Sequence, residues 1–492
     1  MLHNKLIVII ILVFSFFLRF QNINRPLLDA HYFRQTQTAT VARNFYLSGI
    51  DFFHTKLDIF GDGKEKVLLL EFPFFQSIVT SLSPVLGFHD YVGRMVSLLF
   101  GLASGVILVL LTNKFFSNKY IGLAALIFFI FNPLNFYFHQ AYMIESTVIF
   151  LHLLSVYFWF KYTEKNRNNW LILASLFTAI AAIHKIVYAP FLLIPIMSIL
   201  YIKLGKQEFK KLRWLPGILF SIFILFTWLY YTDVTNLANG HSNFTLGDTS
   251  QSLWNFGTLN ERFDVKGWIS KLNFIQNSVT KYLWPIFFTG IFILIRKKEK
   301  AKSVVFAWLL AIVFYYLLLF RIQSHDYYFM LVLPIFSIIA AFGLSEVVRS
   351  VTDNVFAKQT AKYLYIVIIG IYLTLFSYKS IRNAQMYFKI DEDMLARLNT
   401  YKNAIKNPGN ILFIFDQYDW NSAYTYFTGH KGIVVAAENV SAETIEQYIN
   451  KEYKYVVIDG TTAVTKMNNT FPDIFSKYKR LLSTDGMVIF SI

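Results

Sequence analysis

The amino-terminal part of the chain contains the polar stretch Leu28-Asp29-Ala30-His31-Tyr32-Phe33-Arg34-Gln35-Thr36-Gln37-Thr38-Ala39-Thr40-Val41-Ala42-Arg43-Asn44-Phe45-Tyr46. It follows an apolar segment, Lys5–Phe20, and holds a carboxylate, a histidine and two arginines just beyond the end of that segment. Polar groups at the edge of a hydrophobic helix are costly and tend to be functional. The pattern indicates a site that meets one substrate in lipid and another in water.

The composition is that of a membrane protein. Of the 492 residues, 55% are hydrophobic and 15% are charged, whereas soluble proteins carry about 25% charged residues. The net charge of +16 comes from basic residues in short loops between apolar runs, as the positive-inside rule explains, so no nucleic-acid partner is indicated. The chain has no cysteine, which excludes disulfides and thiolate metal sites.

Eleven apolar runs approach the ~20 residues that span a bilayer. They are Lys5–Phe20, Tyr91–Thr112, Tyr120–Phe138, Ile144–Trp159, Trp170–Ile183, Val187–Tyr201, Leu215–Tyr231, Tyr282–Ile295, Val304–Phe320, Tyr328–Leu344 and Tyr363–Tyr378. A further run, Phe72–Gly87, is short and contains Pro84. We interpret it as an interfacial or re-entrant helix, with a missed span elsewhere as the alternative. The predicted fold class is an α-helical polytopic membrane protein with about 11 to 13 transmembrane helices.

Basic loops predict the topology. Four of them are rich in Lys and Arg, and each is separated from the next by two spans: Lys161–Arg167, Lys203–Arg213, Arg296–Lys302 and Arg349–Lys362. All four therefore fall on the cytoplasmic side. This places the N-terminus inside and a first loop, residues 21–71, on the external face.

The chain is expected to have two domains, a transmembrane catalytic domain over residues 1–379 and an external α/β domain over residues 380–492. In the second, Asn410–Phe415, Tyr455–Ile458 and Gly486–Phe490 read as strands, and Ala442–Tyr448 reads as an amphipathic helix. Strands that alternate with helices favour a soluble α/β domain. It has no Gly-rich phosphate loop, and we expect it to cap the external site or bind an acceptor.

Three carboxylates on the external side are candidate catalytic groups: Asp29, Glu71 and Glu145. A sugar transferase needs a base to deprotonate its acceptor, and a carboxylate can serve. A carboxylate can also hold a divalent metal that binds the phosphate leaving group, and Asp29 and Glu71 are the candidate ligands. The alternatives are a helix-capping Asp29, a helix-start Glu71, and a Glu145 that pairs with a nearby Lys or Arg.

Four cations are candidate phosphate-binding groups: Arg34, Arg43, Lys185 and Arg321. Arginine binds phosphate oxygens with two hydrogen bonds, although arginines at a membrane interface also snorkel. Lys185 is the more informative, because a lysine between two apolar runs on the external side breaks the positive-inside pattern. Candidate contacts to the acceptor or sugar are His31, His139, His325 and Tyr328.

These residues resemble those of the polyprenyl-phosphate-sugar-dependent glycosyltransferases with the GT-C fold. This family includes the protein O-mannosyltransferases, the lipid A aminoarabinose transferases and bacterial family-39-like enzymes. The resemblance covers about residues 5 to 350. It rests on the first loop from Asp29 to Tyr46, Glu71-Phe72-Pro73, the hairpin that ends at Glu145, Lys185, and His325 to Tyr328 before Pro334.

The first loop departs from that of many relatives, which carry an adjacent Asp-Glu pair. Here Asp29 is followed by Ala30, and an alignment on Ala42-Arg43 places the pair nearer Arg34-Gln35. Glu71 or Glu145 can therefore share the role of the base.

The resemblance implies a hexosyl- or pentosyltransferase of the bacterial inner membrane. The donor is a polyprenyl-phosphate sugar that reaches the site from membrane lipid, and the acceptor is a glycan, a lipid or a protein. Transfer is expected at the external face with inversion, and no cofactor is required beyond the divalent metal considered above. The alternatives are a lipid-linked-sugar transporter or flippase, for which we find no internal repeat, and a polysaccharide polymerase or ligase.

Overall fold

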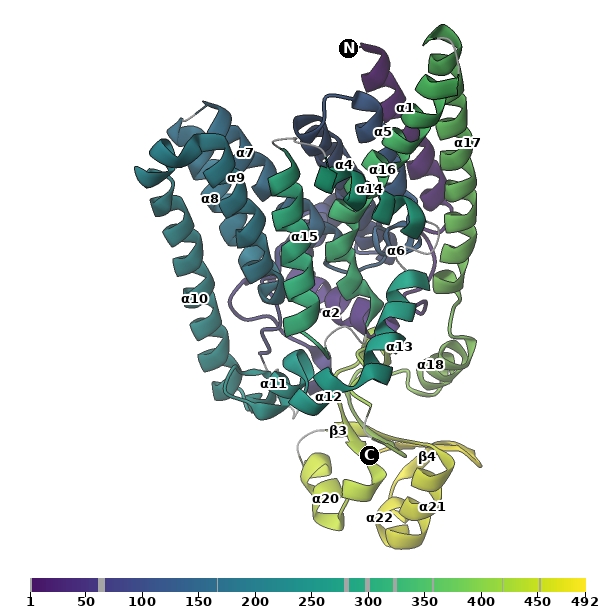
Figure 1. Cartoon of the computed structure of the whole chain (residues 1–492). Helices are drawn as coiled ribbons and strands as arrows, with labels where there is room; N and C mark the ends of the chain where they lie inside the picture. Colours follow the sequence, from purple (N-terminus) through teal and green to yellow (C-terminus); the bar gives the residue numbers. More distant parts are fainter. Residues whose placement is uncertain are drawn as a thin grey trace.

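The computed structural model describes residues 2–60, 67–165, 167–277, 283–296, 301–321, 325–355, 358–417, 419–450 and 453–492. Most of the chain is helical, and Figure 1 shows a helical bundle with the N-terminus at its upper end and the C-terminus in a smaller unit below it. The bundle consists of α1 (Leu2–Phe20), α4 (Asp90–Phe115), α5 (Lys119–Ile130), α7 (Glu145–Lys165), α8 (Asn168–His184), α9 (Ala189–Lys210), α10 (Leu215–Ala238), α14 (Trp284–Arg296), α15 (Ala301–Leu318), α16 (Leu333–Val355) and α17 (Lys358–Ala384).

Shorter helices lie between these long ones. They are α2 (Tyr32–Ser48), α3 (Phe74–Leu86), α6 (Pro133–Phe138), α11 (Thr249–Phe256), α12 (Leu259–Phe263), α13 (Val265–Ile275) and the 3-10 helix η6 (Asp326–Val332). The predicted interfacial segment is the 13-residue helix α3. This length is well below the ~20 residues that a span requires, although its depth in a bilayer stays a prediction.

Each of the eleven predicted runs overlaps a helix, and one of the predictions was wrong in detail. Residues 120–138 do not form one helix, because α5 ends at Ile130 and α6 begins at Pro133. The Asn132 side chain accepts a hydrogen bond from the Leu134 N–H and so caps α6, which Pro133 is well suited to begin. Because the helix breaks here, the chain forms a short hairpin after α6 that leads to Glu145, one of the candidate site residues. Tyr282, the predicted start of one run, and parts of three basic loops lie outside the described residues.

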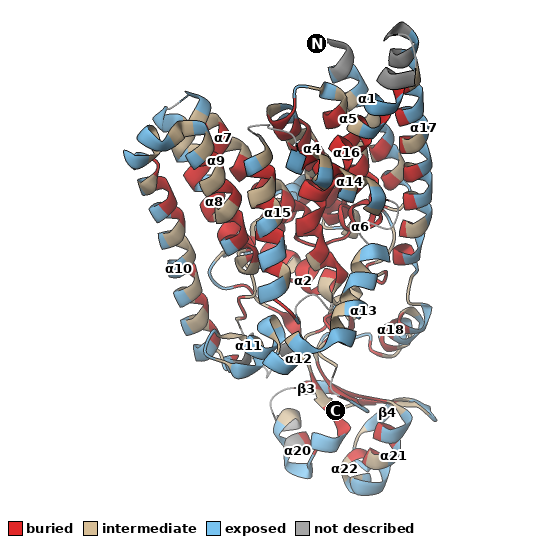
Figure 2. Cartoon of the chain, in the orientation of Figure 1, coloured by how far each residue is buried: buried red, intermediate tan, exposed pale blue. Residues whose placement is uncertain are grey.

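The exposed faces of the outer helices are apolar. On α17, Val367, Ile371 and Leu375 recur every fourth residue and each is more than half exposed, whereas Figure 2 shows α4, α5 and α16 buried within the bundle. Among the residues that the structure describes, five helical segments are long and apolar enough to cross a membrane: Asp90–Phe115, Ile186–Lys210, Leu215–Ala238, Asp326–Thr352 and Tyr363–Ala404. Such apolar faces are suited to contact with a lipid bilayer, and the chain is a multi-pass membrane protein.

The C-terminal unit is a mixed five-stranded sheet with strand order β2-β1-β3-β5-β4. Its strands are β1 (Asn410–Phe415), β2 (Gly432–Ala436), β3 (Tyr453–Asp459), β4 (Lys479–Thr484) and β5 (Met487–Ser491), and its helices are α18 (Glu392–Ala404), α19 (Ala423–Thr428), α20 (Ala442–Asn450), α21 (Thr461–Thr470) and α22 (Pro472–Ser476). β2, β1 and β3 are parallel, and β5 and β4 extend the sheet antiparallel. The sequence predicted β1, β3, β5 and α20.

The two faces of this sheet have different partners, because side chains alternate along a strand. Leu412 and Ile414 of β1 lie on the face that packs against α20 to α22, away from the bundle. Ile411 and Phe413 lie on the opposite face, in one apolar cluster with Leu28, Val41, Phe45, Leu57, Ile59 and Leu68 of the first loop. The sheet and the first loop therefore share a hydrophobic core.

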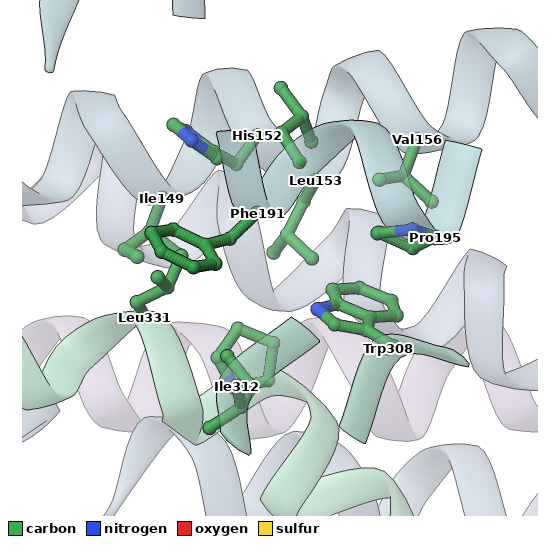
Figure 3. A pocket seen from close by; sticks show the side chains of 11 residues that line it. Ile149, His152, Leu153, Val156, Phe191, Pro195, Trp308, Ile312 and Leu331 are labelled. Atoms are coloured by element: carbon green, nitrogen blue, oxygen red, sulfur yellow. The ribbon is translucent and has the colours of Figure 1, made fainter. Parts of the chain in front are cut away.

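The bundle also holds an apolar pocket between α7, α9, α15 and α16. It contains about 370 Å³ of empty space, counting the part open to the outside, and Figure 3 shows Phe191, Leu153, Trp308 and Ile312 pointing into it. His152 is the one ionisable side chain in its lining. The ring of His152 lies 5.8 Å from that of Tyr188, so the pocket adjoins the segment that follows Lys185.

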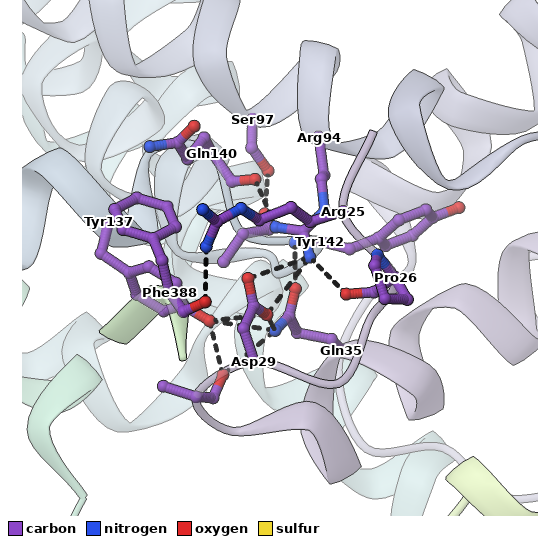
Figure 4. A network of polar contacts seen from close by, with 12 residues as sticks. Arg25, Pro26, Asp29, Gln35, Arg94, Ser97, Tyr137, Gln140, Tyr142 and Phe388 are labelled. Atoms are coloured by element: carbon purple, nitrogen blue, oxygen red, sulfur yellow. Dashed lines mark hydrogen bonds and ion pairs between the residues drawn. The ribbon is translucent and has the colours of Figure 1, made fainter. Parts of the chain in front are cut away.

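A buried polar network fixes the first loop to the bundle (Figure 4). The two oxygens of Asp29 lie 3.2 and 3.1 Å from Arg94 Nη2 on α4, and neither side chain is exposed. Tyr137 Oη of α6 donates to Asp29 Oδ1 at 2.9 Å, and the Gln35 amide also donates to Asp29. Asp29 thus joins the first loop, α4 and the α6 hairpin in one closed cluster.

Close approach of α14 and α16 depends on two glycines. A Cβ on Gly343 would lie 2.2 Å from the Ile286 carbonyl oxygen and 2.8 Å from the Gly290 nitrogen, both of them backbone atoms. Gly343→Ala should therefore force the helices apart and lower the unfolding temperature in detergent by several degrees, because backbone cannot move aside as a side chain can. Gly370→Ala in α17 is the control, since nothing lies within 4 Å of that Cβ. Equal unfolding temperatures for the two variants would contradict the close packing.

Asp29→Asn should destabilise the fold, because it leaves the buried Arg94 guanidinium without its counter-charge. The expected loss is about 3 kcal/mol or more, as for other broken buried ion pairs, measured as a fall in the unfolding temperature of the purified protein. Asp51→Asn is the control: Asp51 belongs to the same loop and pairs with His54, but it is about half exposed and should cost little. A stable Asp29→Asn protein with wild-type unfolding would show that Asp29 does not anchor the loop.

Candidate active site

The site begins at the N-terminus of α2, which runs from Tyr32 to Ser48. His31 precedes the helix with φ of 56°, in the left-handed region that residues other than glycine rarely adopt. This conformation turns the chain from the buried Asp29 into the helix. One turn later, α2 presents Arg34 on the side away from the Asp29 network.

Arg34 forms an ion pair with Glu71, the residue that begins Glu71-Phe72-Pro73 ahead of α3. Arg34 Nη2 donates to Glu71 Oε2 at 2.6 Å, and both side chains are largely buried. Burial opposes the charge on Arg34, but the Glu71 carboxylate outweighs it and holds the pKa of the guanidinium above its ordinary value. A small pocket beside Glu71 is lined in part by Gln37 and Gln76.

Lys185 forms a second buried ion pair, with Glu145 at the start of α7. Lys185 Nζ donates to Glu145 Oε1 at 2.5 Å, and the side chains are 8% and 2% exposed. The rings of Tyr188, Tyr327 and Tyr328 surround the ammonium, with centroids 5.1, 5.0 and 4.5 Å away. The second oxygen of Glu145 is buried and has no hydrogen-bond partner among the described residues.

The third polar pair joins the first loop to η6. His31 Nε2 lies 2.6 Å from Asp326 Oδ1, and both side chains are largely buried. The rings of His325 and Tyr327 lie 5.6 and 5.1 Å from the His31 ring. Burial and the neighbouring His31 lower the pKa of His325 to about 4, so His325 is neutral near pH 7 and adds no positive charge to the site.

These three pairs form one cluster. The Tyr327 ring contacts both the His31 ring and the Lys185 ammonium, and Arg34 interacts electrostatically with Glu145 as well as with Glu71. Residues from the first loop, α7, the segment after α8 and η6 therefore converge. The structure brings together seven of the predicted site residues: His31, Arg34, Glu71, Glu145, Lys185, His325 and Tyr328. Asp29 lies apart from them, buried in the network with Arg94 and Gln35.

Three further predicted residues lie elsewhere. Arg43 pairs with Asp58 at 2.7 Å and lies over the Tyr426 ring, so it connects α2 to α19 of the C-terminal unit. Arg321 is partly exposed and pairs with Glu261 of α12 at 2.7 Å. His139 is buried against the Phe129 ring. The functional roles predicted for these residues stay predictions.

The predicted metal ligands do not form a metal site. Asp29 faces Arg94 and Glu71 faces Arg34, so each carboxylate already balances a guanidinium. Within the described ranges, no three His, Asp or Glu side chains converge on a point that could hold a metal ion. These carboxylates therefore do not fit the needs of a divalent cation.

Sequence reasoning missed several partners of these residues. Arg94 lies in a predicted apolar span, and an arginine within a span was an available signal for a buried counter-ion. Gln35 and Tyr137 carried no such signal, because a glutamine in a polar helix and a tyrosine in an aromatic run are both ordinary. Tyr188 and Tyr327 read as interfacial tyrosines, which are common.

Comparisons with known proteins agree with this architecture. A family model described as dolichyl-phosphate-mannose-protein mannosyltransferase matches residues 70–231, which include Glu71, Glu145 and Lys185. No curated protein sequence matches the chain. ArnT from Cupriavidus metallidurans bound to undecaprenyl phosphate is similar in structure, with a TM-score of 0.65 and 12% identity over 99% of this chain and 97% of that one.

Two further solved structures are similar. ArnT from the same organism in the apo state gives a TM-score of 0.66 at 11% identity, over 99% of this chain and 97% of that chain. The archaeal oligosaccharyltransferase AglB from Archaeoglobus fulgidus, in complex with an inhibitory peptide and a dolichol-phosphate, gives 0.52 at 12% identity over 97% and 73%. The chain is a multi-pass membrane protein with the GT-C fold of the polyprenyl-phosphate-sugar-dependent glycosyltransferases.

Proposed function

We propose that the protein transfers a sugar from a polyprenyl-phosphate donor to a glycan, lipid or protein acceptor, with inversion, at the external face of a bacterial inner membrane. The observation that carries this proposal is the buried Lys185–Glu145 pair within its three tyrosines. A lysine ammonium in a low-dielectric site attracts a phosphate far more strongly than one in water.

The position of the apolar pocket supports a lipid-linked donor. The pocket adjoins Tyr188, which follows Lys185 by three residues and whose ring contacts the ammonium. A prenyl chain that packs against this apolar lining would bring its phosphate to Lys185. Burial of apolar chain contributes about 0.8 kcal/mol per CH₂ group, so the lipid supplies affinity and the cation fixes the phosphate.

The proposed reaction is a single displacement. An acceptor oxygen or nitrogen attacks the anomeric carbon, the bond from that carbon to the phosphate oxygen breaks, and polyprenyl phosphate leaves with the electron pair. Lys185 and Arg34 stabilise the negative charge that develops on the phosphate. The unpartnered oxygen of Glu145 and the pocket beside Glu71 offer acceptors for hydroxyl groups of the donor sugar.

The predicted topology supports the external face. The site lies near the end of the bundle that faces the C-terminal unit, whereas the N-terminus lies at the opposite end (Figure 1). With the N-terminus in the cytoplasm, as the basic loops favour, the site and residues 380–492 are external. The C-terminal unit then closes the site from the aqueous side.

The experiment that tests this function is transfer of label from radiolabelled polyprenyl-phosphate sugars to a membrane extract by the purified full-length protein. Lys185→Ala should lower the rate of transfer by about 100-fold, as loss of one charge-stabilising donor does elsewhere, and should weaken the binding of undecaprenyl phosphate. Lys114→Ala is the matched control: Lys114 also pairs with a glutamate, Glu164 at 2.5 Å, and lies over an aromatic ring. Its rate should stay within about twofold of wild type.

Two results would contradict the proposal. Equal loss in the two lysine variants would show that Lys185 has no special role in donor binding. No transfer from any lipid-linked donor, combined with movement of lipid-linked sugar across proteoliposome membranes, would favour a transporter.

A further inference from the structure

The site lacks an obvious base among its carboxylates. Asp29, Glu71 and Glu145 each lie against a buried cation, at 3.1, 2.6 and 2.5 Å respectively. A cation therefore already occupies each of these carboxylates as a hydrogen-bond partner, and Asp29 is in addition closed off from solvent. The proton of the acceptor therefore needs another destination.

We propose that His31 is the general base of the reaction and that Asp326 is the positioning residue that orients it. This inference rests on the function proposed above. His31 Nε2 contacts Asp326 Oδ1 at 2.6 Å, so Nε2 carries the proton and Nδ1 keeps a free lone pair. Within the described part of the chain, Nδ1 has no recorded hydrogen-bond partner, and the His31 side chain is 17% exposed.

The surroundings of His31 favour a catalytic role over a structural one. Its backbone lies in the left-handed region, at φ of 56°, and strain of this kind in a residue other than glycine clusters at functional sites. Asp326 is 295 residues away in sequence, so the pair is built by the folded chain rather than by local geometry. The Tyr327 ring connects the dyad to the Lys185 ammonium.

The step balances without a further reactant. The acceptor oxygen or nitrogen forms the new bond to the anomeric carbon as its proton passes to His31 Nδ1. The bond between the anomeric carbon and the phosphate oxygen breaks, and its electron pair leaves with polyprenyl phosphate. The Asp326 carboxylate stabilises the imidazolium, which then returns its proton to water.

The decisive variant is His31→Asn. Asparagine is one of the residues enriched in the left-handed region, so the loop should keep its conformation. It has no basic nitrogen, however, and kcat for transfer should fall by about 10²- to 10⁴-fold, the usual contribution of a general base. Binding of undecaprenyl phosphate should stay within about twofold, because the dyad does not hold the phosphate.

Two further measurements separate catalysis from packing. Free imidazole should restore part of the activity of His31→Ala, because it can occupy the vacated space and accept the proton. Asp326→Asn should lower kcat in the wild-type background but add little to His31→Asn, as expected for residues that act as a unit. The matched control is His54→Asn. Like His31, His54 belongs to the first loop and pairs with an aspartate, in this case Asp51 at 2.9 Å, but its side chain is 53% exposed.

The outcomes distinguish this inference from the proposed function. Transfer by wild type with an unchanged kcat in His31→Asn would overturn the base assignment and leave the transferase in place. A different result would show that the contact between His31 and Asp326 has only a structural role. In that case kcat and lipid binding would both fall in His31→Asn, and imidazole would not restore the activity of His31→Ala. Absence of transfer by wild type with every lipid-linked donor would overturn both proposals.

Discussion

The buried ion pair between Asp29 and Arg94 is the constraint on which the site depends. Neither side chain reaches solvent, and in a low-dielectric interior the desolvation of two charges is recovered only when geometry and hydrogen bonding are good. Tyr137 and Gln35 supply that hydrogen bonding. The pair fixes where the first loop leaves the bundle, and therefore where His31 and Arg34 lie relative to Glu145 and Lys185.

Paired charges recur at each level of the site. Arg34 with Glu71 and Lys185 with Glu145 place two cations and two carboxylates in a nearly dry region. Such an arrangement is neutral overall, so the site can persist in the absence of a ligand at low electrostatic cost. In the proposed reaction, an arriving phosphate competes with the carboxylates for the same cations, and each glutamate that it releases can turn to a sugar hydroxyl. Donor recognition is then an exchange of partners rather than the filling of an empty positive pocket.

The sequence predicted the helices well and the contacts between them poorly. Hydrophobic runs and the helix-favouring stretch Tyr32–Ser48 are local signals, and each corresponds to a helix. The break at Asn132 was missed because aromatic residues continue on both sides of it. The strands β2 and β4 were missed because Gly432–Ala436 is short and Lys479–Thr484 is a polar edge strand.

The candidate site residues were recognised individually, but their partners were not. Lys185 with Glu145 and His31 with Asp326 are separated by 40 and 295 residues, and nothing in the local pattern of either member specifies the other. The role of Arg94 was hidden because one charge in a long apolar run does not alter the prediction of a span. The sidedness that the basic loops indicate stays a prediction, whereas the pairing of these residues required the fold.

The shared core between the C-terminal sheet and the first loop has a consequence for biogenesis. Leu28, Val41 and Phe45 are made early in synthesis, but their apolar partners Ile411 and Phe413 are made only after all the long helices. The first loop must therefore wait, incompletely packed, until the last hundred or so residues have been made. A ribosome-bound nascent chain would hold a membrane bundle without a finished candidate site, which delays assembly of that site until translation is complete.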